Sequence, residues 1–302
     1  ECRKRTGAAV EQMVAYTSSQ THSSLEKGGN VAGYGHVRLL DVDETFSARP
    51  ESLRAAIEAD ITAGLTPAFV CAAVGTTGTT AVDPVRAFGE IAAEFDLWFH
   101  IDAAYAGAAM LCEEFRHHQD GLELVDSYTF NAHKWLATNF DCSIFWVADR
   151  TPLIQTLSIL PPYLKNAATE SGSVIDYRDW HVPLGRRFRA LKLWFVLRSF
   201  GVEGLQALIR SHVAMANDFT TWVEAHPKLK LFAPTEFGLV CFTHVDGNDA
   251  TGALAEGINA AGSVYVTPSA IDDTRFIRVS IGSTWTETRH VDGLRDLIQS
   301  LL

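Results

Sequence analysis

The sequence predicts an α/β protein built on a mostly parallel sheet, with a smaller α+β part at its C-terminal end. Short apolar runs alternate with amphipathic helical patterns through the first part of the chain. These runs are almost continuously apolar, which is typical of strands that are covered on both faces. After about residue 186 the pattern changes to one long helix followed by alternating strands.

The expected elements of the first part follow one another regularly. The expected strands are HVRLLDV (36–42), PAFVCAAVG (67–75), LWFHIDAAY (97–105) and CSIFWVA (142–148). Helices are expected over 50–64 and 83–96, the second with Asp83 as N-cap and Pro84 at the first helical position. The chain opens on sequence that reads as helical, so no beginning of the sheet is evident.

The C-terminal part is expected to form a separate, smaller domain. Residues 186–227 read as a long amphipathic helix that is interrupted near Gly201. LKLFAP, GLVCFTHV and RFIRVSIG alternate like strands of an antiparallel sheet with one face in water, and a closing helix covers 289–302. We place the boundary near residue 191, which gives domains 1–191 and 192–302.

Charge and hydropathy exclude several classes of function. The formal net charge of −11 argues against nucleic acid, which selects a basic surface, and gives no support for docking to an anionic membrane. No apolar run approaches the ~20 residues that span a bilayer. The five cysteines are widely scattered and show no metal-ligand spacing, which favours free thiols in a reducing cytoplasm and no metal site.

Two ionisable residues stand at the ends of apolar strands. Asp102 closes LWFHID before two small residues, where it either caps the next turn or meets a cation or donors of a flat ligand. Lys134 lies in NAHKWLATNF, just before an apolar run. Either it is a surface lysine whose aliphatic stem packs on Trp135, or its amine forms a Schiff base with a cofactor aldehyde.

Pyridoxal phosphate is a cofactor that needs both groups. It takes a lysine for its aldehyde and a carboxylate for its pyridinium nitrogen, and its ring is usually covered by something flat. His22 in AYTSSQTHSS could supply that cover, or it could be a surface or capping histidine. Thr77 in VGTTGTT either belongs to an ordinary turn or lies near the cofactor.

These motifs carry a resemblance to a known family. TSSQTHSS, VGTTGTT, HIDAAYAG, NAHKWLATNFDCS, PPYLK and PLGRRFRALKLWF occur in the order and near the spacing of group II pyridoxal-phosphate decarboxylases. The chain looks most like aromatic-L-amino-acid decarboxylases. The resemblance implies the aspartate-aminotransferase-like (type I) fold, a homodimer, and decarboxylation of an aromatic L-amino acid of the DOPA, tryptophan, 5-hydroxytryptophan, tyrosine or phenylalanine type to its arylalkylamine.

The resemblance also implies which residues surround the cofactor ring. Lys134 would carry the Schiff base, and Asp102 would pair with the pyridinium nitrogen. His22 would stack on one face of the ring and Ala104 would lie against the other.

Further positions would contact the edges of the cofactor. Thr77 would sit near the polar edge of the ring, with Asn131 and Ser127 near the phosphate. His133 would lie beside the lysine and contact the cofactor or the facing subunit.

Downstream motifs of the resemblance concern substrate and proton transfer. Tyr163 would protonate the carbanion from a lid over about 160–173, a segment poor in hydrophobic residues that could also be a plain surface loop. Arg186 would be an active-site residue or a structural ion-pair arginine, and Gly185 would leave room for a bicyclic substrate ring. Aldehyde synthases of the family carry phenylalanine in place of the loop tyrosine, so Tyr163 favours simple decarboxylation.

Members of this family are longer than 302 residues. The resemblance therefore implies that the segments for dimerisation, for most of the substrate-ring pocket and for the phosphate grip lie outside this chain. We expect the N-terminal fragment of the same protein as a companion chain. The non-enzymatic alternative is a truncated chain that is inactive without that half.

Overall fold

The computed structural model describes residue 2 and residues 6–158 and 175–302. The first part contains a six-stranded sheet in the order β2-β1-β3-β4-β5-β6, in which neighbours from β2 to β5 are parallel and β6 runs antiparallel to β5. The strands are β1 (Met13–Ser18), β2 (His36–Leu40), β3 (Thr66–Ala73), β4 (Trp98–Asp102), β5 (Ser127–Asn131) and β6 (Ser143–Val147). The predicted mostly parallel sheet is confirmed.

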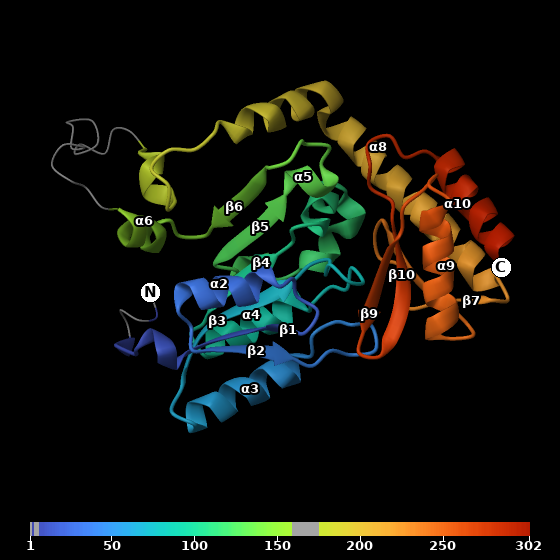
Figure 1. Ribbon diagram of the computed structural model, residues 1–302. Coiled ribbons are helices and arrows are strands. Elements are labelled where there is room, and N and C mark those ends of the chain that lie inside the picture. Colours follow the sequence, from blue (N-terminus) through green and yellow to red (C-terminus); the bar gives the residue numbers. More distant parts are fainter. Residues whose placement is uncertain (1, 3–5, 159–174) are drawn as a thin grey trace.

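Helices lie on both sides of this sheet, with α2 on one side and α3 on the other (Figure 1). In α3 and α4 the buried face carries apolar side chains such as Ile57 and Phe88, which join the main hydrophobic core. The helical elements here are η1 (Val10–Gln12), α2 (Ser24–Ala32), α3 (Pro50–Thr62), α4 (Val85–Glu94), η2 (Ala106–Leu111), η3 (Glu113–Gln119), η4 (Leu122–Leu124), α5 (Ala132–Trp135), α6 (Thr151–Leu157) and η6 (Tyr177–Trp180).

The sheet begins earlier than the sequence predicted. All six residues of β1 are buried, and β1 pairs with β2 on one edge and β3 on the other, so the expectation of a helical opening without a strand was wrong. Tyr16 explains part of the difficulty, because its ring is buried while its hydroxyl donates to Asp60 at 3.0 Å. Because all residues of this central strand are buried and some of them are polar, its sequence shows no alternation of apolar and polar residues.

Asp83 is not the N-cap of α4, contrary to expectation. The N-cap is Pro84, and the helix begins at Val85. Asp83 is fully buried instead, and its carboxylate accepts the backbone N–H groups of Ala48 at 2.8 Å and Ala73 at 2.7 Å. It thereby ties the end of β3 to the loop before α3.

Replacing Asp83 with asparagine is expected to lower the free energy of unfolding by about 1–3 kcal/mol, because the amide nitrogen cannot accept one of the two buried N–H groups. Burial raises the pKa of Asp83 to about 6, so at pH 7 the native side chain is mostly the carboxylate that both donors need. Urea denaturation at pH 7 measures the loss. Asp296→Asn on the exposed face of α10 (Thr288–Leu301) is the control. Equal stabilities of the two variants would contradict the assignment.

The second sheet has the order β7-β8-β10-β9 and is antiparallel throughout. Three helices pack against it, and the C-terminal half of the longest one supplies much of the shared core. The elements are α8 (Arg189–Ala225), β7 (Leu229–Leu231), β8 (Leu239–His244), α9 (Asn248–Ala260), β9 (Thr267–Ile271), β10 (Thr274–Ser280) and α10. The predicted interruption of the long helix is confirmed at Gly201, whose φ of 67° and ψ of 173° break it.

The second sheet does not leave one face in water, as the sequence had suggested. Leu239, Cys241 and Phe276 are buried on the face opposite α8, α9 and α10, in a cluster that also holds Phe46 from the first part of the chain. GLVCFTHV is in fact an almost continuous apolar run, which fits a strand covered on both faces. The two parts are therefore packed together.

The predicted domain boundary near residue 191 falls in the first turn of α8 and stays a prediction. All five cysteines are free thiols, and four of them are buried. Within the described residues no helix combines the length and the hydropathy needed to cross a membrane.

Candidate functional site

The carboxyl ends of β3, β4 and β5 meet at a cavity of about 280 Å³, as expected for a parallel sheet. The cavity brings together the sequence-predicted residues His22, Thr77, Asp102, Ala104, Asn131 and Lys134. It is also lined by residues that were not singled out, namely Ser24, Ala73, Gly75, Thr76, Tyr105 and Thr129.

Asp102 is the last residue of β4, and its position is fixed locally. Its Oδ1 accepts the backbone N–H of Ala104 at 2.9 Å. One carboxylate oxygen is thereby engaged, and the other can accept a donor within the cavity. The same turn is held to β5, because Asn131 N–H donates to the carbonyl of Ala104 at 3.0 Å.

Lys134 lies in the single turn α5, between two residues that are held tightly. Ala132 and Trp135 are buried, whereas Lys134 itself is exposed and lines the cavity. The Trp135 ring stacks on Tyr105 with centroids 4.7 Å apart and an interplanar angle of 8°. The apolar neighbours therefore fix the backbone of the lysine, while its amine stays available.

His22 precedes α2 and is anchored by its own turn. The backbone N–H of Ser24 donates to Nδ1 at 3.2 Å, and the Ser24 hydroxyl lies 2.9 Å from the same nitrogen. Because Nδ1 accepts, the proton of the neutral ring lies on Nε2.

Gly75 allows a close approach of two backbone segments at the cavity: its φ is +85°, and a Cβ would come within 2.7 Å of the Ala106 methyl.

A second cavity of about 430 Å³ adjoins the first and shares four residues with it, namely Thr76, Thr77, Tyr105 and Lys134. Its remaining wall comes largely from the C-terminal part of the chain and includes Leu239, Arg278, Ser280, Gly282 and Ser283. Lys134 therefore lines two adjoining cavities.

Arg278 is the residue in this second cavity that sequence reasoning missed. Its Nε donates to the carbonyl of Gly78 at 3.0 Å and its Nη2 to that of Thr77 at 2.6 Å. A basic residue inside the apolar strand RFIRVSIG was the available signal. Its partners lie about two hundred residues earlier, so no local pattern could have paired them.

Ser127 does not line the first cavity. It begins β5, whereas the cavity lies where β5 ends, and it is buried. Its Oγ accepts Trp98 Nε1–H at 2.8 Å and lies 2.8 Å from His100 Nδ1. These contacts use the hydroxyl within the protein, and its expected place near the cofactor phosphate stays a prediction.

His133, next to the lysine, points elsewhere. Its Nδ1 accepts the backbone N–H of Cys142 at 3.0 Å, and its ring lies edge-on to Phe140 with centroids 4.9 Å apart. It does not line either of the two cavities. Its proposed contact with the cofactor or the facing subunit stays a prediction.

Two further predicted residues lie apart from the cavities. Gly185 and Arg186 are exposed in the coil before α8 and line neither cavity. The ion pairs of the GRRFR motif are formed by Arg187 and Arg189, both with Asp141. Tyr163 lies outside the described residues.

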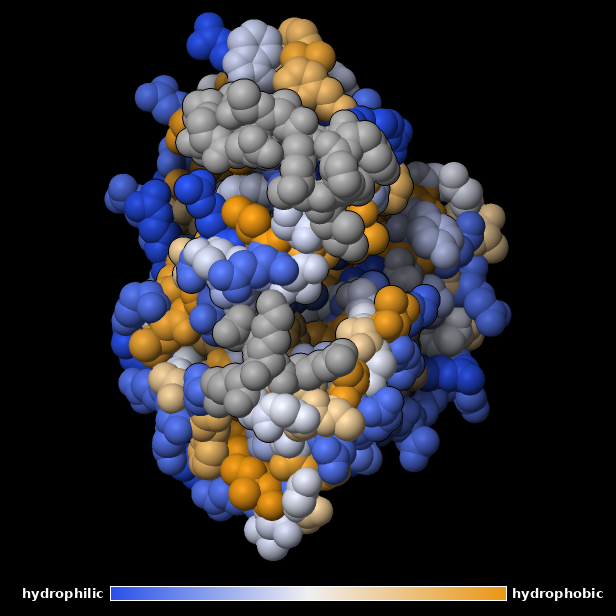
Figure 2. Space-filling view, turned by 90° about the vertical axis from the view of Figure 1, so that its left-hand side faces the viewer, coloured by the Kyte–Doolittle hydropathy of each residue, from blue (hydrophilic) through white to orange (hydrophobic). Residues whose placement is uncertain are grey.

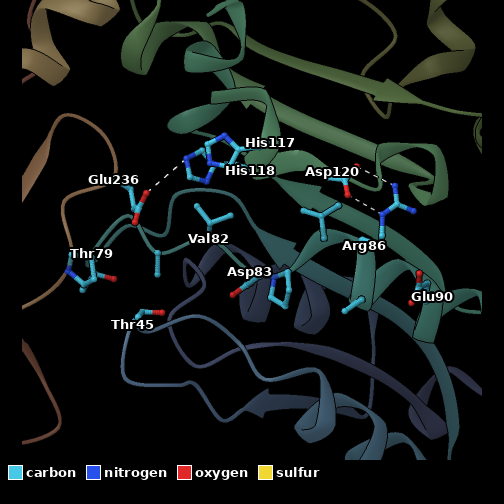
Figure 3. A pocket seen from close by; sticks show the side chains of 15 residues that line it. Thr45, Thr79, Val82, Asp83, Arg86, Glu90, His117, His118, Asp120 and Glu236 are labelled. Carbon is cyan, nitrogen blue, oxygen red and sulfur yellow. Dashed lines mark hydrogen bonds and ion pairs between the residues drawn. The ribbon is translucent and has the colours of Figure 1, made fainter. Parts of the chain in front are cut away.

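A larger cavity of about 700 Å³ opens elsewhere, between the start of α4, η3 and the loop before β8 (Figure 3). Within it Arg86 pairs with Asp120, and His118 Nε2 lies 3.8 Å from a Glu236 carboxylate oxygen. Burial, with a smaller contribution from His117, lowers the pKa of His118 to about 4. None of the predicted site residues lines it, so size alone does not identify the functional site.

The family model described as the pyridoxal-dependent decarboxylase conserved domain matches residues 3–245. The chain belongs to this family. The described residues contain no group of three or more histidine, cysteine or acidic side chains that could hold a metal ion.

Several relatives act on aromatic amino acids according to their names. Tryptophan decarboxylase 2 of Oryza sativa subsp. japonica is 42% identical over 98% of this chain. The aromatic-L-amino-acid decarboxylase of Cavia porcellus is 44% identical over 98%, and the phenylacetaldehyde synthase of Arabidopsis thaliana is 44% identical over 96%. The chain spans 62% of the length of each of these three relatives.

Solved structures of family members confirm the type I fold. The Oryza sativa TDC structure with PLP and tryptamine has a TM-score of 0.95 and 41% identity, covering 99% of this chain and 65% of that one. The Catharanthus roseus tryptophan decarboxylase in complex with L-tryptophan has a TM-score of 0.92 and 42% identity, with the same coverage.

Proposed function

We propose that this chain carries the catalytic lysine of a pyridoxal-phosphate enzyme that decarboxylates aromatic L-amino acids to arylalkylamines. The observation that carries the proposal is the meeting of Lys134, Asp102 and His22 at one cavity. The names of the relatives support the choice of an aromatic substrate.

The donor set of the cavity fits pyridoxal phosphate. Lys134 offers an exposed amine for the aldehyde, and Asp102 offers a carboxylate oxygen for the pyridinium nitrogen. His22 and Ala104 line the same space and would hold a flat ring between them. The bound cofactor would supply an electron sink for the pair released with carbon dioxide.

Residues of the adjoining cavity would act on the substrate. Arg278 places a guanidinium there that donates from Nε and Nη2 to backbone carbonyls, which fixes its position. Such a cation can orient a substrate carboxylate.

Two further residues would contact the edges of the cofactor. Thr77 lines both cavities and would lie at the polar edge of the ring, and Asn131 would lie near the phosphate.

The proposal is tested by assaying decarboxylation of tryptophan, 5-hydroxytryptophan, DOPA, tyrosine and phenylalanine. The assay contains the protein, pyridoxal phosphate and the N-terminal fragment that we expect as its companion chain. Equimolar amine and carbon dioxide are expected from at least one of them. We also propose that Gly185 leaves room for a bicyclic ring. Turnover of DOPA without any turnover of tryptophan or 5-hydroxytryptophan would contradict that part.

A second candidate function is oxidative formation of an aldehyde, because one relative is named a phenylacetaldehyde synthase. We propose that Tyr163 decides between the two outcomes by protonating the carbanion after carbon dioxide leaves. Simple decarboxylation is therefore favoured for this chain.

Phenylalanine in place of Tyr163 is expected to lower amine formation by about 10²-fold, since a general acid is lost. Product should shift toward aldehyde and hydrogen peroxide, with oxygen consumed. Chromatography of the products and a peroxide assay measure the shift, and Tyr265→Phe at an exposed position is the control. Unchanged amine output would remove the proposed role of Tyr163.

We further propose that a partner covers apolar surface of this chain, either a second copy in a homodimer or the companion N-terminal fragment. The face seen in Figure 2 carries hydrophobic residues gathered in several places among hydrophilic ones. Large apolar side chains are exposed from the loop before β6 to the first half of α8, including Phe140, Phe145, Trp146, Val182, Leu184, Phe188, Trp194 and Phe195. The free cysteine thiols support a cytoplasmic location.

A further inference from the structure

Trp135, the neighbour of Lys134, is buried where the first, mostly parallel part of the chain contacts the C-terminal part. Its indole is buried between the Tyr105 ring and two glycines, Gly238 just before β8 and Gly282 just after β10. A Cβ on Gly238 would come within 3.3 Å of Trp135 Cζ2, and one on Gly282 within 3.5 Å of Cδ1. The C-terminal sheet is therefore seated directly on the residue that follows the lysine.

One histidine closes this contact with hydrogen bonds in both directions. His212 lies in the second half of α8 and is fully buried. Its Nδ1 accepts Trp135 Nε1–H at 3.0 Å, and its Nε2 lies 3.1 Å from the backbone carbonyl of Ser283. Its ring is also stacked near the indole, with centroids 6.4 Å apart and an angle of 18°.

The two partners determine the protonation of His212. An indole N–H can only donate and a carbonyl can only accept, so Nδ1 must be bare and Nε2 must carry the proton. In the imidazolium form, a proton on Nδ1 would point at the Trp135 Nε1–H, and this hydrogen bond would be lost. Burial also lowers the pKa of His212, opposed by the bond to Ser283.

The contact between Trp135, His212 and Ser283 joins two parts of the wall of the second cavity. Trp135 sets the backbone of α5 and hence of Lys134, while Ser283 and Gly282 form part of the wall of the second cavity. We infer that His212 is a positioning residue: as a neutral bridge it holds the lysine at a fixed place relative to the wall that the C-terminal part contributes. Its effect on turnover rests on the proposed function, whereas the bridge itself does not.

The first test measures the bridge without cofactor or substrate. In ¹⁵N NMR spectra of the histidine-labelled protein at neutral pH, His212 is expected to show a bare Nδ1 and a protonated Nε2. Assignment uses the signals that vanish in His212→Gln. A charged ring, or a proton on Nδ1, would overturn the inference.

The second test compares two replacements. Glutamine can still accept from Trp135 and donate to Ser283, whereas leucine can do neither. We expect His212→Leu to lower kcat/KM by about tenfold or more, because misplacement far from the chemistry is costly, and His212→Gln to recover most of the loss. The pH midpoint of the visible band of the bound cofactor should shift in the leucine variant only.

The control is His226→Leu at the end of the same helix, where the ring meets Trp222 and Gln299. It should leave kcat/KM and the band unchanged. A folded glutamine variant as impaired as the leucine variant would overturn the positioning role. If the leucine variant does not fold, the glutamine variant and the NMR spectrum decide. A wild-type protein that binds no cofactor would instead count against the proposed function, leaving the NMR result to judge the bridge.

Discussion

Alanine in place of Lys134 is expected to abolish decarboxylation, with kcat/KM falling about 10³-fold or more, because the covalent attachment point of the cofactor is lost. The folded state should change little, since the side chain is exposed and its neighbours Ala132 and Trp135 provide the packing. Initial rates of amine formation, together with the visible band of the cofactor, measure the effect.

The matched control is Lys230→Ala, an exposed lysine on β7 far from the cavity in sequence and structure. It should retain both the band and the rate. A Lys134→Ala protein that keeps a native fold and still decarboxylates at a comparable rate would contradict the assignment of the catalytic lysine.

Asparagine in place of Asp102 is expected to lower kcat/KM by about 10²–10³-fold, the usual cost of removing one preorganised electrostatic partner. The amide oxygen can still accept Ala104 N–H, so the turn after β4 should persist. What is lost is the negative charge that would keep the pyridinium nitrogen protonated. Steady-state kinetics and thermal unfolding, measured side by side, separate the two effects.

Asp249→Asn in the first turn of α9 is the control for Asp102, since it removes an exposed carboxylate of the same kind. It should leave kcat/KM unchanged. If Asp102→Asn lost activity only in proportion to a loss of folded protein, Asp102 would be a structural residue of the turn.

Much of the candidate site could be predicted because it follows from local sequence. Asp102 and Asn131 come at the ends of strands, where a parallel sheet gathers its ligands, and Lys134 follows in the next turn. The short motifs around His22 and Thr77 carried the remainder through the family resemblance. All of these residues line one cavity in the structure.

What could not be predicted depends on contacts between distant segments. Asp83 resembles an N-cap in sequence, yet two backbone donors on other segments take its carboxylate. The hydroxyl of Ser127 contacts Trp98 and His100 on the neighbouring strand, which its own sequence motif does not indicate. No local pattern reveals such partners.

The same limit applies to the packing of the two parts. The strand GLVCFTHV was assigned a wet face because the loop around Phe46, which covers it, lies far earlier in the chain. The contacts of Arg278 and His212 likewise could not be predicted locally. Arg278 donates to the VGTTGTT turn and His212 accepts from Trp135, where the C-terminal part packs on the first part. Local patterns thus place the strands, while the packing decides their burial.

The central claim is that Lys134 holds the cofactor, and reductive trapping tests it most directly. The protein would be incubated with pyridoxal phosphate, reduced with borohydride, digested and analysed by mass spectrometry. The peptide that contains Lys134 is expected to carry the phosphopyridoxyl group, and substrate added before reduction should suppress the label. Label on other lysines with Lys134 unmodified, or no stable label at all, would contradict the account.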